Sequence, residues 1–271
     1  MIPLYIITEW RKRHSWPLQN QVDQDLLISR VLVELYSDAK IASSLAFRGG
    51  TALYKLFFTP SPRYSEDIDL VQVNAEPIGG ILDRIRNILD PLFGTPQRKL
   101  DKALATITYR FLSEEVPHLN LRLKIEINTR EHFAVMGFAK KDFSVSTSWF
   151  SGQAEILTYH LEELMATKLR ALYQRNKGRD LFDFWFVLNN SQLDVQNTIQ
   201  IFSRYMEQQG LSISRAQFEQ NLYEKEASKT FLEDVPPLLS AEMVAKWQSH
   251  KVLSLIQNKV ISRLPGDPWK G

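Results

Sequence analysis

The sequence predicts an α+β fold in which a mixed β-sheet core flanked by helices is followed by an all-helical C-terminal region. Between residues 67 and 128, segments that alternate apolar and polar residues occur between segments whose apolar residues recur at helical spacing. After Thr158 the spacing is helical almost to the end of the chain. The 271 residues suffice for one large domain or two small ones. We therefore expect a core with N-terminal helices at residues 1–158 and a helical domain at residues 159–271.

Three helices are expected in the first of these regions, at residues 22–46, 51–58 and 77–92. In the first segment, valine, leucine and tyrosine side chains recur three and four residues apart, as on one face of a helix. Prolines follow the second helix, and Pro91 falls near the end of the third. Proline stops a helix because it lacks a backbone donor and clashes with the preceding turn.

Three strands are expected, one around Asp67 and Asp69 and two at residues 103–112 and 119–128. The last two lie close together in the sequence and both alternate, so we expect an antiparallel pair. In the third strand, leucine and isoleucine fill one face, while charged and amide side chains fill the other. Residues 129–158 show no clear pattern and are expected to form loops.

The composition is that of an ordinary globular protein, with 44% hydrophobic and 24% charged residues. The net charge of +2, from 33 basic and 31 acidic residues, is too small for a surface that binds polyanions broadly. A surface that binds RNA would therefore have to be a local patch. The chain has no cysteine, which excludes disulfides, thiolate metal sites and cysteine nucleophiles.

Neither export nor a membrane anchor is expected. The N-terminal apolar run is about six residues long and precedes the first charged residues, unlike a secretory signal. No segment approaches the roughly 20 apolar residues of a membrane span. We therefore expect a cytoplasmic protein.

The segment at residues 47–70, FRGGTALYKLFFTPSPRYSEDIDL, carries the most specific signal in the chain. Asp67 and Asp69 alternate with apolar residues, so both carboxylates point to one face of a strand, within about 7 Å of each other. Oxygen ligands at that separation suit one or two Mg²⁺ ions. Gly49 and Gly50 let the backbone come close to a phosphate, which amides at a helix N-terminus can hold.

This combination resembles the first motif of the DNA polymerase β-type nucleotidyltransferase superfamily, a diglycine plus serine or threonine followed by Asp-x-Asp on a strand. The fuller string, GGTALYK followed by RYSEDID, resembles the AbiEii/AbiGii toxin family of bacterial toxin–antitoxin systems more closely. The resemblance implies a nucleotidyltransferase-type sheet with Asp67 and Asp69 as catalytic ligands of Mg²⁺, or alternatively Mn²⁺. It also implies that Gly49, Gly50 and Thr51 cradle the phosphates of a nucleotide.

Further residues of the expected site follow from the same resemblance. Arg63 and Ser65 would shape the nucleotide-binding site. Glu126, on the polar face of the strand at 119–128, would be the third catalytic metal ligand, because the superfamily places a carboxylate on such a strand. On alternation alone, the alternative is an ordinary half-exposed strand with a polar face.

The predicted helix from Leu161 carries an apolar stripe, and Lys168 occupies a position in the middle of this stripe. A lysine there loses its hydration and needs an anion nearby. A nucleoside triphosphate would be such a partner. The alternative is a lysine that reaches the surface or pairs with a structural carboxylate. On packing alone, Lys168→Met is expected to be neutral or stabilising.

A charged break around a glycine leads into a second apolar helix, which contains Arg179, Asp180 and Asp183. The two aspartates are three residues apart and lie on one side of it, and Arg179 and Asp183 are expected to pair because they are four apart. The string KLRALYQRNKGRDLFDFW resembles a later motif of the same toxin family. The resemblance implies catalytic roles for Lys168 and Asp183 and nucleotide binding by Lys168, Arg179 and Asp180, so that the C-terminal domain completes the active site. The alternative is a helix–helix junction held by ion pairs.

As a whole, the resemblance implies a toxin that transfers a nucleoside monophosphate from an NTP to RNA, with the 3′ end of tRNA as the acceptor. It also implies growth arrest, a role in phage defence, and neutralisation by a cognate antitoxin, typically a winged-helix protein encoded beside it. Two alternatives stay open: transfer of a nucleotide or phosphate to a protein hydroxyl, and a catalytically inactive regulatory module on the same fold.

Overall fold

A computed structural model describes residues 2–14, 16–113, 118 and 120–271 of the chain. The contacts between Cα atoms divide the chain into two compact units, residues 1–159 and residues 160–271. The first unit contains the sheet, and the second is helical. None of the helices in the described ranges is long and apolar enough to cross a membrane.

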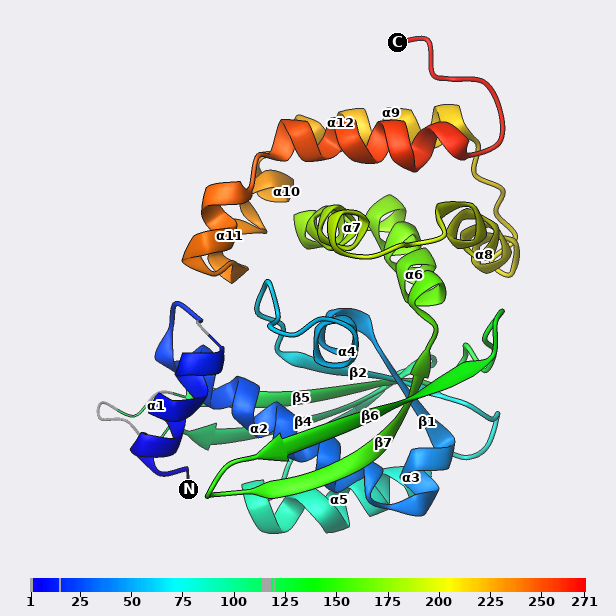
Figure 1. The fold of residues 1–271 in the computed structure, drawn as a ribbon. Coiled ribbons are helices and arrows are strands. Elements are labelled where there is room, and N and C mark those ends of the chain that lie inside the picture. The colour runs from blue at the N-terminus through cyan, green and yellow to red at the C-terminus, as the bar shows by residue number, and fades with distance from the viewer. Residues whose placement is uncertain (1, 15, 114–117, 119) are drawn as a thin grey trace. The chain divides into compact units, whose positions relative to one another are not determined.

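The first unit is a mixed sheet with helices on both faces (Figure 1). Its helices are α1 (Leu4–Arg13), α2 (Gln19–Tyr36), α3 (Ala39–Ser44), α4 (Gly49–Leu56) and α5 (Gly79–Phe93). Its strands are β1 (Leu45–Arg48), β2 (Asp67–Gln72), β3 (Gln97–Leu100), β4 (Leu104–Leu112), β5 (Asn120–Asn128), β6 (Phe138–Ser146) and β7 (Ser151–Tyr159). They form one seven-stranded sheet in the order β3-β4-β5-β2-β1-β7-β6.

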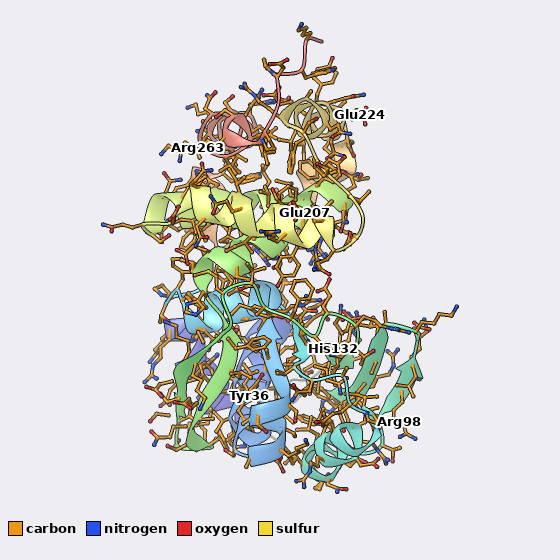
Figure 2. All side chains as sticks on the ribbon, turned by 90° about the vertical axis from the view of Figure 1, so that its right-hand side faces the viewer. Tyr36, Arg98, His132, Glu207, Glu224 and Arg263 are labelled. Atoms are coloured by element: carbon orange, nitrogen blue, oxygen red, sulfur yellow. The ribbon has the colours of Figure 1, made fainter. Side chains whose placement is uncertain are left out.

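Strand β2 lies at the centre of this sheet, parallel to β5 and antiparallel to β1. Strands β4 and β5 form the expected antiparallel pair, although Leu119, at the start of the predicted strand, lies outside the described residues. His132, labelled in Figure 2, follows β5. Its Nδ1 donates a hydrogen bond of 2.9 Å to the carbonyl of Gln72 at the end of β2. Arg98 marks the edge strand β3 in the same view.

The two faces of the sheet differ in character. Ile68 and Leu70 of β2 are buried in a core with apolar residues of α2, α3 and α5, which lie on one side of the sheet (Figure 1). Asp67 and Asp69 point to the other face, where α4 packs on β1, β2 and β6. The expected alternation of β2 is therefore confirmed, and it places both aspartates on the face that carries α4.

The helix predicted at residues 22–46 is wrong in its second half. The helix α2 ends at Tyr36, and Asp38 begins α3 by accepting hydrogen bonds of 2.9 Å from the backbone amides of Lys40 and Ile41. The chain then turns into the short strand β1. A strand of four residues, three of them buried, is too short to show alternation in the sequence.

The region predicted as loops also differs, because β6 and β7 form an antiparallel hairpin there. Strand β6 is an edge strand, and most of its side chains are exposed or half-buried, so its apolar pattern is weak. Smaller differences occur in two helices. The helix α4 begins at Gly49 instead of Thr51, and α5 continues two residues past Pro91.

The second unit contains only helices among its described elements, as predicted for this part of the chain. These are α6 (Leu161–Gln174), α7 (Gly178–Asn190), α8 (Val195–Glu207), α9 (Arg215–Glu226), α10 (Lys229–Glu233), η1 (Pro236–Leu238), α11 (Ala241–Lys246), α12 (Ser249–Lys259) and η2 (Ile261–Arg263). The helix α6 packs against α7 and α8, and α12 packs against α7. Pro236 and Pro237 lie in the short 3₁₀ turn η1.

A buried ion pair joins α4 to the N-terminal helices of the first unit. The ammonium of Lys55 on α4 lies 2.7 Å from Oδ1 of Asp25 on α2 and donates to the hydroxyl of Ser29 at 2.8 Å. The indole of Trp10 on α1 donates to Oδ2 of the same aspartate at 2.8 Å. Asp25 is 2% exposed, so its charge depends on these partners instead of water.

We predict that Lys55→Met destabilises the protein by about 3–5 kcal/mol, because it leaves the Asp25 carboxylate buried without its cation. Chemical denaturation measures the change in the free energy of unfolding. The double variant Lys55→Met/Asp25→Asn should recover much of the loss. Lys40→Met is a matched control, since the Lys40–Glu76 pair is exposed and should contribute at most about 1 kcal/mol. A loss as small as that of the control would contradict the prediction.

Candidate active site

The turn from β1 into α4 brings the backbone against Asp69. Gly49 has a φ of +81°, which favours glycine, and a Cβ atom built on it would lie 2.2 Å from Oδ2 of Asp69. A Cβ atom on Gly50 would lie 2.5 Å from the guanidinium of Arg63 and 3.0 Å from the hydroxyl of Ser65. No side chain fits at either position without displacing these groups. The predicted diglycine is therefore required by close approach of the backbone to the site residues.

Thr51 and Ser65 hold the start of β2 next to this turn. The Thr51 hydroxyl donates to the carbonyl of Asp67 at 2.6 Å and lies 2.9 Å from the Ser65 hydroxyl, which has its own proton to donate. Thr51 is 1% exposed. Its side chain is thus engaged within the protein, and its hydroxyl positions the strand that carries the two aspartates.

Arg63 is also buried, with 2% of its surface exposed. Its Nη1 donates to the carbonyl of Tyr64 at 2.9 Å, and its guanidinium lies 5.1 Å from the centre of the Tyr54 ring. The same guanidinium borders Gly50, so Arg63 fills the space beside the turn between β1 and α4.

Strand β5 places Glu126 beside the aspartates. In the parallel pairing of β2 with β5, Asp69 lies in register with Glu126 and Asp67 with Lys124. All four side chains project from the same face, because their positions alternate with buried apolar residues. Glu126 Oε1 lies 2.9 Å from the Lys124 ammonium. In this arrangement, no three His, Cys, Asp or Glu side chains of the described residues form a group that could hold a metal ion.

Two cations that sequence reasoning missed lie on either side of these carboxylates. Burial lowers the pKa of Lys124, but its hydrogen bond to Glu126 and the charge of Asp67 outweigh that effect and raise it. Arg48 pairs in register with Asp69 on the other side and lies 2.6 Å from Glu131. The sequence could have pointed to Lys124, since it lies two residues from Glu126 on the same polar face. The position of Arg48 beside Asp69 could not be predicted without the register of β1 and β2.

In the second unit, Lys168 of α6 is buried between two carboxylates of α7. Its ammonium lies 3.1 Å from Asp180 Oδ1 and 2.9 Å from Asp183 Oδ2. Lys168 is 6% exposed, and both aspartates are 0% exposed. The expectation of an anion beside Lys168 is confirmed, and the anions present are the two aspartates. They project from one side of α7, as their spacing predicted.

Arg175 completes this cluster, although no pattern in the sequence pointed to it. Its guanidinium contacts both oxygens of Asp180, at 2.7 and 2.9 Å. Burial would raise the pKa of Asp180, but the charges of Lys168 and Arg175 outweigh it and hold the pKa below its usual value. The predicted partner of Arg179 was wrong. Arg179 pairs with Asp234 at 3.5 Å, and its backbone amide donates to the same carboxylate.

The site around the diglycine turn and the Lys168 cluster both contain charged side chains that are held in place by hydrogen bonds and ion pairs. The sequence profile of the AbiEii family, a nucleotidyltransferase toxin of a type IV toxin–antitoxin system, matches residues 30–251. The chain belongs to the AbiEii family. The family match includes the diglycine turn, all three candidate carboxylates and the Lys168 cluster. No curated protein sequence matches the chain.

Solved structures share the fold of this AbiEii protein at low sequence identity. MenT4, a nucleotidyltransferase toxin from Mycobacterium tuberculosis, superposes with a TM-score of 0.70 at 13% identity, over 98% of this chain and 92% of MenT4. A putative nucleotidyltransferase from Helicobacter pylori gives 0.52 at 16% identity, over 92% and 100% of the two chains. JHP933 from Helicobacter pylori gives 0.51 at 16% identity, over 91% and 95%. The predicted nucleotidyltransferase fold is confirmed.

The Lys168 cluster reverses one expectation from the sequence, because Lys168 neutralises two buried carboxylates. We predict that Lys168→Met lowers the free energy of unfolding by about 3–5 kcal/mol instead of leaving it unchanged. Lys168→Met/Asp183→Asn should be more stable than Lys168→Met, since one uncompensated charge is removed. Lys177→Met is the control, because Lys177 is half-exposed and 3.5 Å from Asp234. Chemical denaturation measures the free energy of unfolding of the three variants. If Lys168→Met were as stable as the control, Lys168 would not be needed to compensate the charges of Asp180 and Asp183.

Proposed function

We propose that this toxin transfers a nucleoside monophosphate from an NTP to the 3′-hydroxyl of an RNA, with the tRNA acceptor end as the substrate, in a reaction that depends on Mg²⁺ or Mn²⁺. Membership of the AbiEii family supports nucleotidyl transfer by a toxin. The observation that carries the proposal is the close approach of the Gly49 backbone to the Asp69 carboxylate. It places the backbone amides at the start of α4, which can hold a phosphate, directly beside oxygen ligands for a metal.

The residue types present suit a divalent cation, although the three carboxylates would have to turn toward one another to form a closed set of ligands. Asp67, Asp69 and Glu126 offer hard oxygen donors from one face of the sheet, and Asp69 and Glu126 are side by side in the strand register. The Lys124 ammonium already lies against Glu126, which indicates that this face attracts positive charge. When bound, a metal would lower the pKa of the attacking hydroxyl and stabilise the negative charge on the leaving pyrophosphate.

In the reaction, the 3′ oxygen of the acceptor forms a bond to the α-phosphorus while the bond to the β-phosphate oxygen breaks. Pyrophosphate leaves, and the hydroxyl gives up its proton. Gly49 and Gly50 let the backbone reach the phosphates. Thr51, Ser65 and Arg63 hold the turn and the start of β2 in place, which keeps the reacting groups aligned.

We also propose a nucleotide-binding role for the second motif, as the family resemblance implies. In this proposal, the Lys168 ammonium contacts the triphosphate in exchange for part of its pairing with Asp180 and Asp183, which orient it. Arg179 would contact the nucleotide as well. Growth arrest, phage defence and neutralisation by an antitoxin, typically a winged-helix protein, follow from the family and stay predictions for this chain.

We predict that Asp67→Asn and Asp69→Asn each lower transfer by at least about 100-fold, because each removes a ligand of the proposed metal. The readout is incorporation of labelled NTP into RNA, with thermal melting as a check on folding. Asp142→Asn removes an exposed carboxylate from strand β6 and should leave transfer unchanged. Wild-type transfer by a well-folded Asp67→Asn or Asp69→Asn protein would sink the metal assignment.

The acceptor is tested with the same labelled nucleotides. The wild-type protein is incubated with each NTP and total RNA, and separately with RNA-free cell protein. Label that follows the RNA and appears at its 3′ end supports the proposal. Label found only on protein supports transfer to a protein hydroxyl, and no label in either sample supports an inactive regulatory module.

Lys124 generates a separate prediction about the metal. Removing its positive charge in Lys124→Met should strengthen Mn²⁺ binding about tenfold, equal to about 1.4 kcal/mol, because the ammonium competes with the metal for Glu126. Free Mn²⁺ is measured by electron paramagnetic resonance. Lys140→Met removes an exposed lysine that pairs with Glu155 and should not change the affinity. Unchanged or weaker binding by Lys124→Met would show that this lysine does not compete with the metal.

A further inference from the structure

A pair of arginines lies on the same face of the sheet, beyond the carboxylates. Arg110 of β4 is directly opposite Arg122 of β5 in the antiparallel register, and both side chains are exposed. Side chains directly opposite each other on neighbouring strands are in contact range, and like charges there repel. Among the described residues, no carboxylate forms an ion pair with Arg110.

The surroundings of this pair add further positive charge. Lys124 follows Arg122 on the same face of β5, and the hydroxyl of Thr108 lies in register with Lys124. Arg122 meets Glu66 at 3.3 Å, but both side chains are nearly half exposed, so this ion pair contributes little. Three cations and one hydroxyl therefore occupy two cross-strand pairs of β4 and β5 that are neighbours on this face, Arg110–Arg122 and Thr108–Lys124. Such an arrangement becomes favourable when an anion binds between the arginines.

The position of the pair relative to the aspartates suggests which anion. Lys124 is in register with Asp67, and Arg122 lies two residues farther from Asp69 along β5. That step is roughly 7 Å along the strand, close to the length of one nucleotide in an extended chain. A strand whose 3′ end reaches Asp67 and Asp69 along β5 from this side would carry its next phosphates past the arginines.

We infer that Arg110 and Arg122 bind a backbone phosphate of the acceptor RNA close to its reacting 3′ end. This inference rests on the proposed function, in which the acceptor is RNA. Two guanidinium groups can each donate two hydrogen bonds to the oxygens of one phosphate, and Thr108 adds a hydroxyl donor nearby. A phosphate contact of this kind reads no base. It fixes the direction of the strand and the distance of its end from the carboxylates.

The test is the double variant Arg110→Gln/Arg122→Gln, which keeps the polar side chains and removes both charges. Binding of unmodified tRNA without NTP is measured over a range of salt concentrations. We expect at least tenfold weaker binding at low salt and a slope of log K against log salt that is smaller by about 0.7 for each phosphate that the variant no longer neutralises. Binding of NTP and Mn²⁺ should not change. The melting temperature should stay the same or rise, because the repulsion between the arginines is gone.

Arg98→Gln is the matched control. Arg98 is an exposed arginine on the neighbouring edge strand, but it is in register with the buried Ile107 and so belongs to the opposite face of the sheet. It should leave tRNA affinity and salt dependence unchanged. A single Arg110→Gln variant should show part of the effect of the double variant, and it replaces the double variant if that protein does not fold.

The outcomes separate this inference from the proposed function. If Arg110→Gln/Arg122→Gln binds tRNA like the wild type while Asp67→Asn still abolishes transfer to RNA, only the inference is overturned. If the wild type neither binds nor labels RNA but labels protein, the RNA acceptor and the inference both fall. If the double variant loses an acidic protein partner and keeps its tRNA affinity, the arginines serve a protein interface and the inference is overturned.

Discussion

The contact between the Gly49 backbone and the Asp69 carboxylate constrains most of the sheet-bearing unit. It joins three elements, because β1 ends at Arg48, α4 begins at Gly49, and Asp69 belongs to β2. The register of β1 with β2 pairs Arg48 with Asp69 and therefore fixes where the helix can start. A shift of one residue in β2 would turn both aspartates into the apolar core and expose Ile68 and Leu70. The register that places the glycine turn beside Asp69 is thus the same register that buries Ile68 and Leu70 in the core.

In the helical unit, buried charges instead of backbone geometry specify how two elements pack. Two aspartates on α7 are fully buried, and Lys168 and Arg175 supply two positive charges, so the cluster is neutral as a whole. Apolar residues in these places would pack without any cost of desolvation. A buried ionic cluster tolerates few alternative arrangements of α6 and α7, since every shift leaves a charge without its partner. The cluster therefore specifies one packing of these two helices.

The sequence was informative where a pattern repeats and uninformative where strand register decides. The alternation around Asp67 and Asp69 predicted their shared face, and the break in the apolar stripe of α6 predicted a buried Lys168 with an anion beside it. Strand β1 was missed because four residues show no periodicity. The hairpin of β6 and β7 was missed because an edge strand buries few side chains. Arg48 and Arg175 acquire their roles only through neighbours that are distant in sequence or on another turn.

The N-terminal helix has a consequence for how the family can vary. Trp10 and Asp25 both lie outside residues 30–251, yet the Trp10 indole donates to the carboxylate that pairs with Lys55 on the helix of the diglycine turn. In a homologue without this helix, Oδ2 of Asp25 would need another donor or water, while Lys55 would still pair with Oδ1. Positions 25 and 55 carry opposite charges in one buried pair, so they should change together wherever one of them becomes neutral. Covariation among these three positions would record which lineages keep the N-terminal helix as a support for the glycine turn.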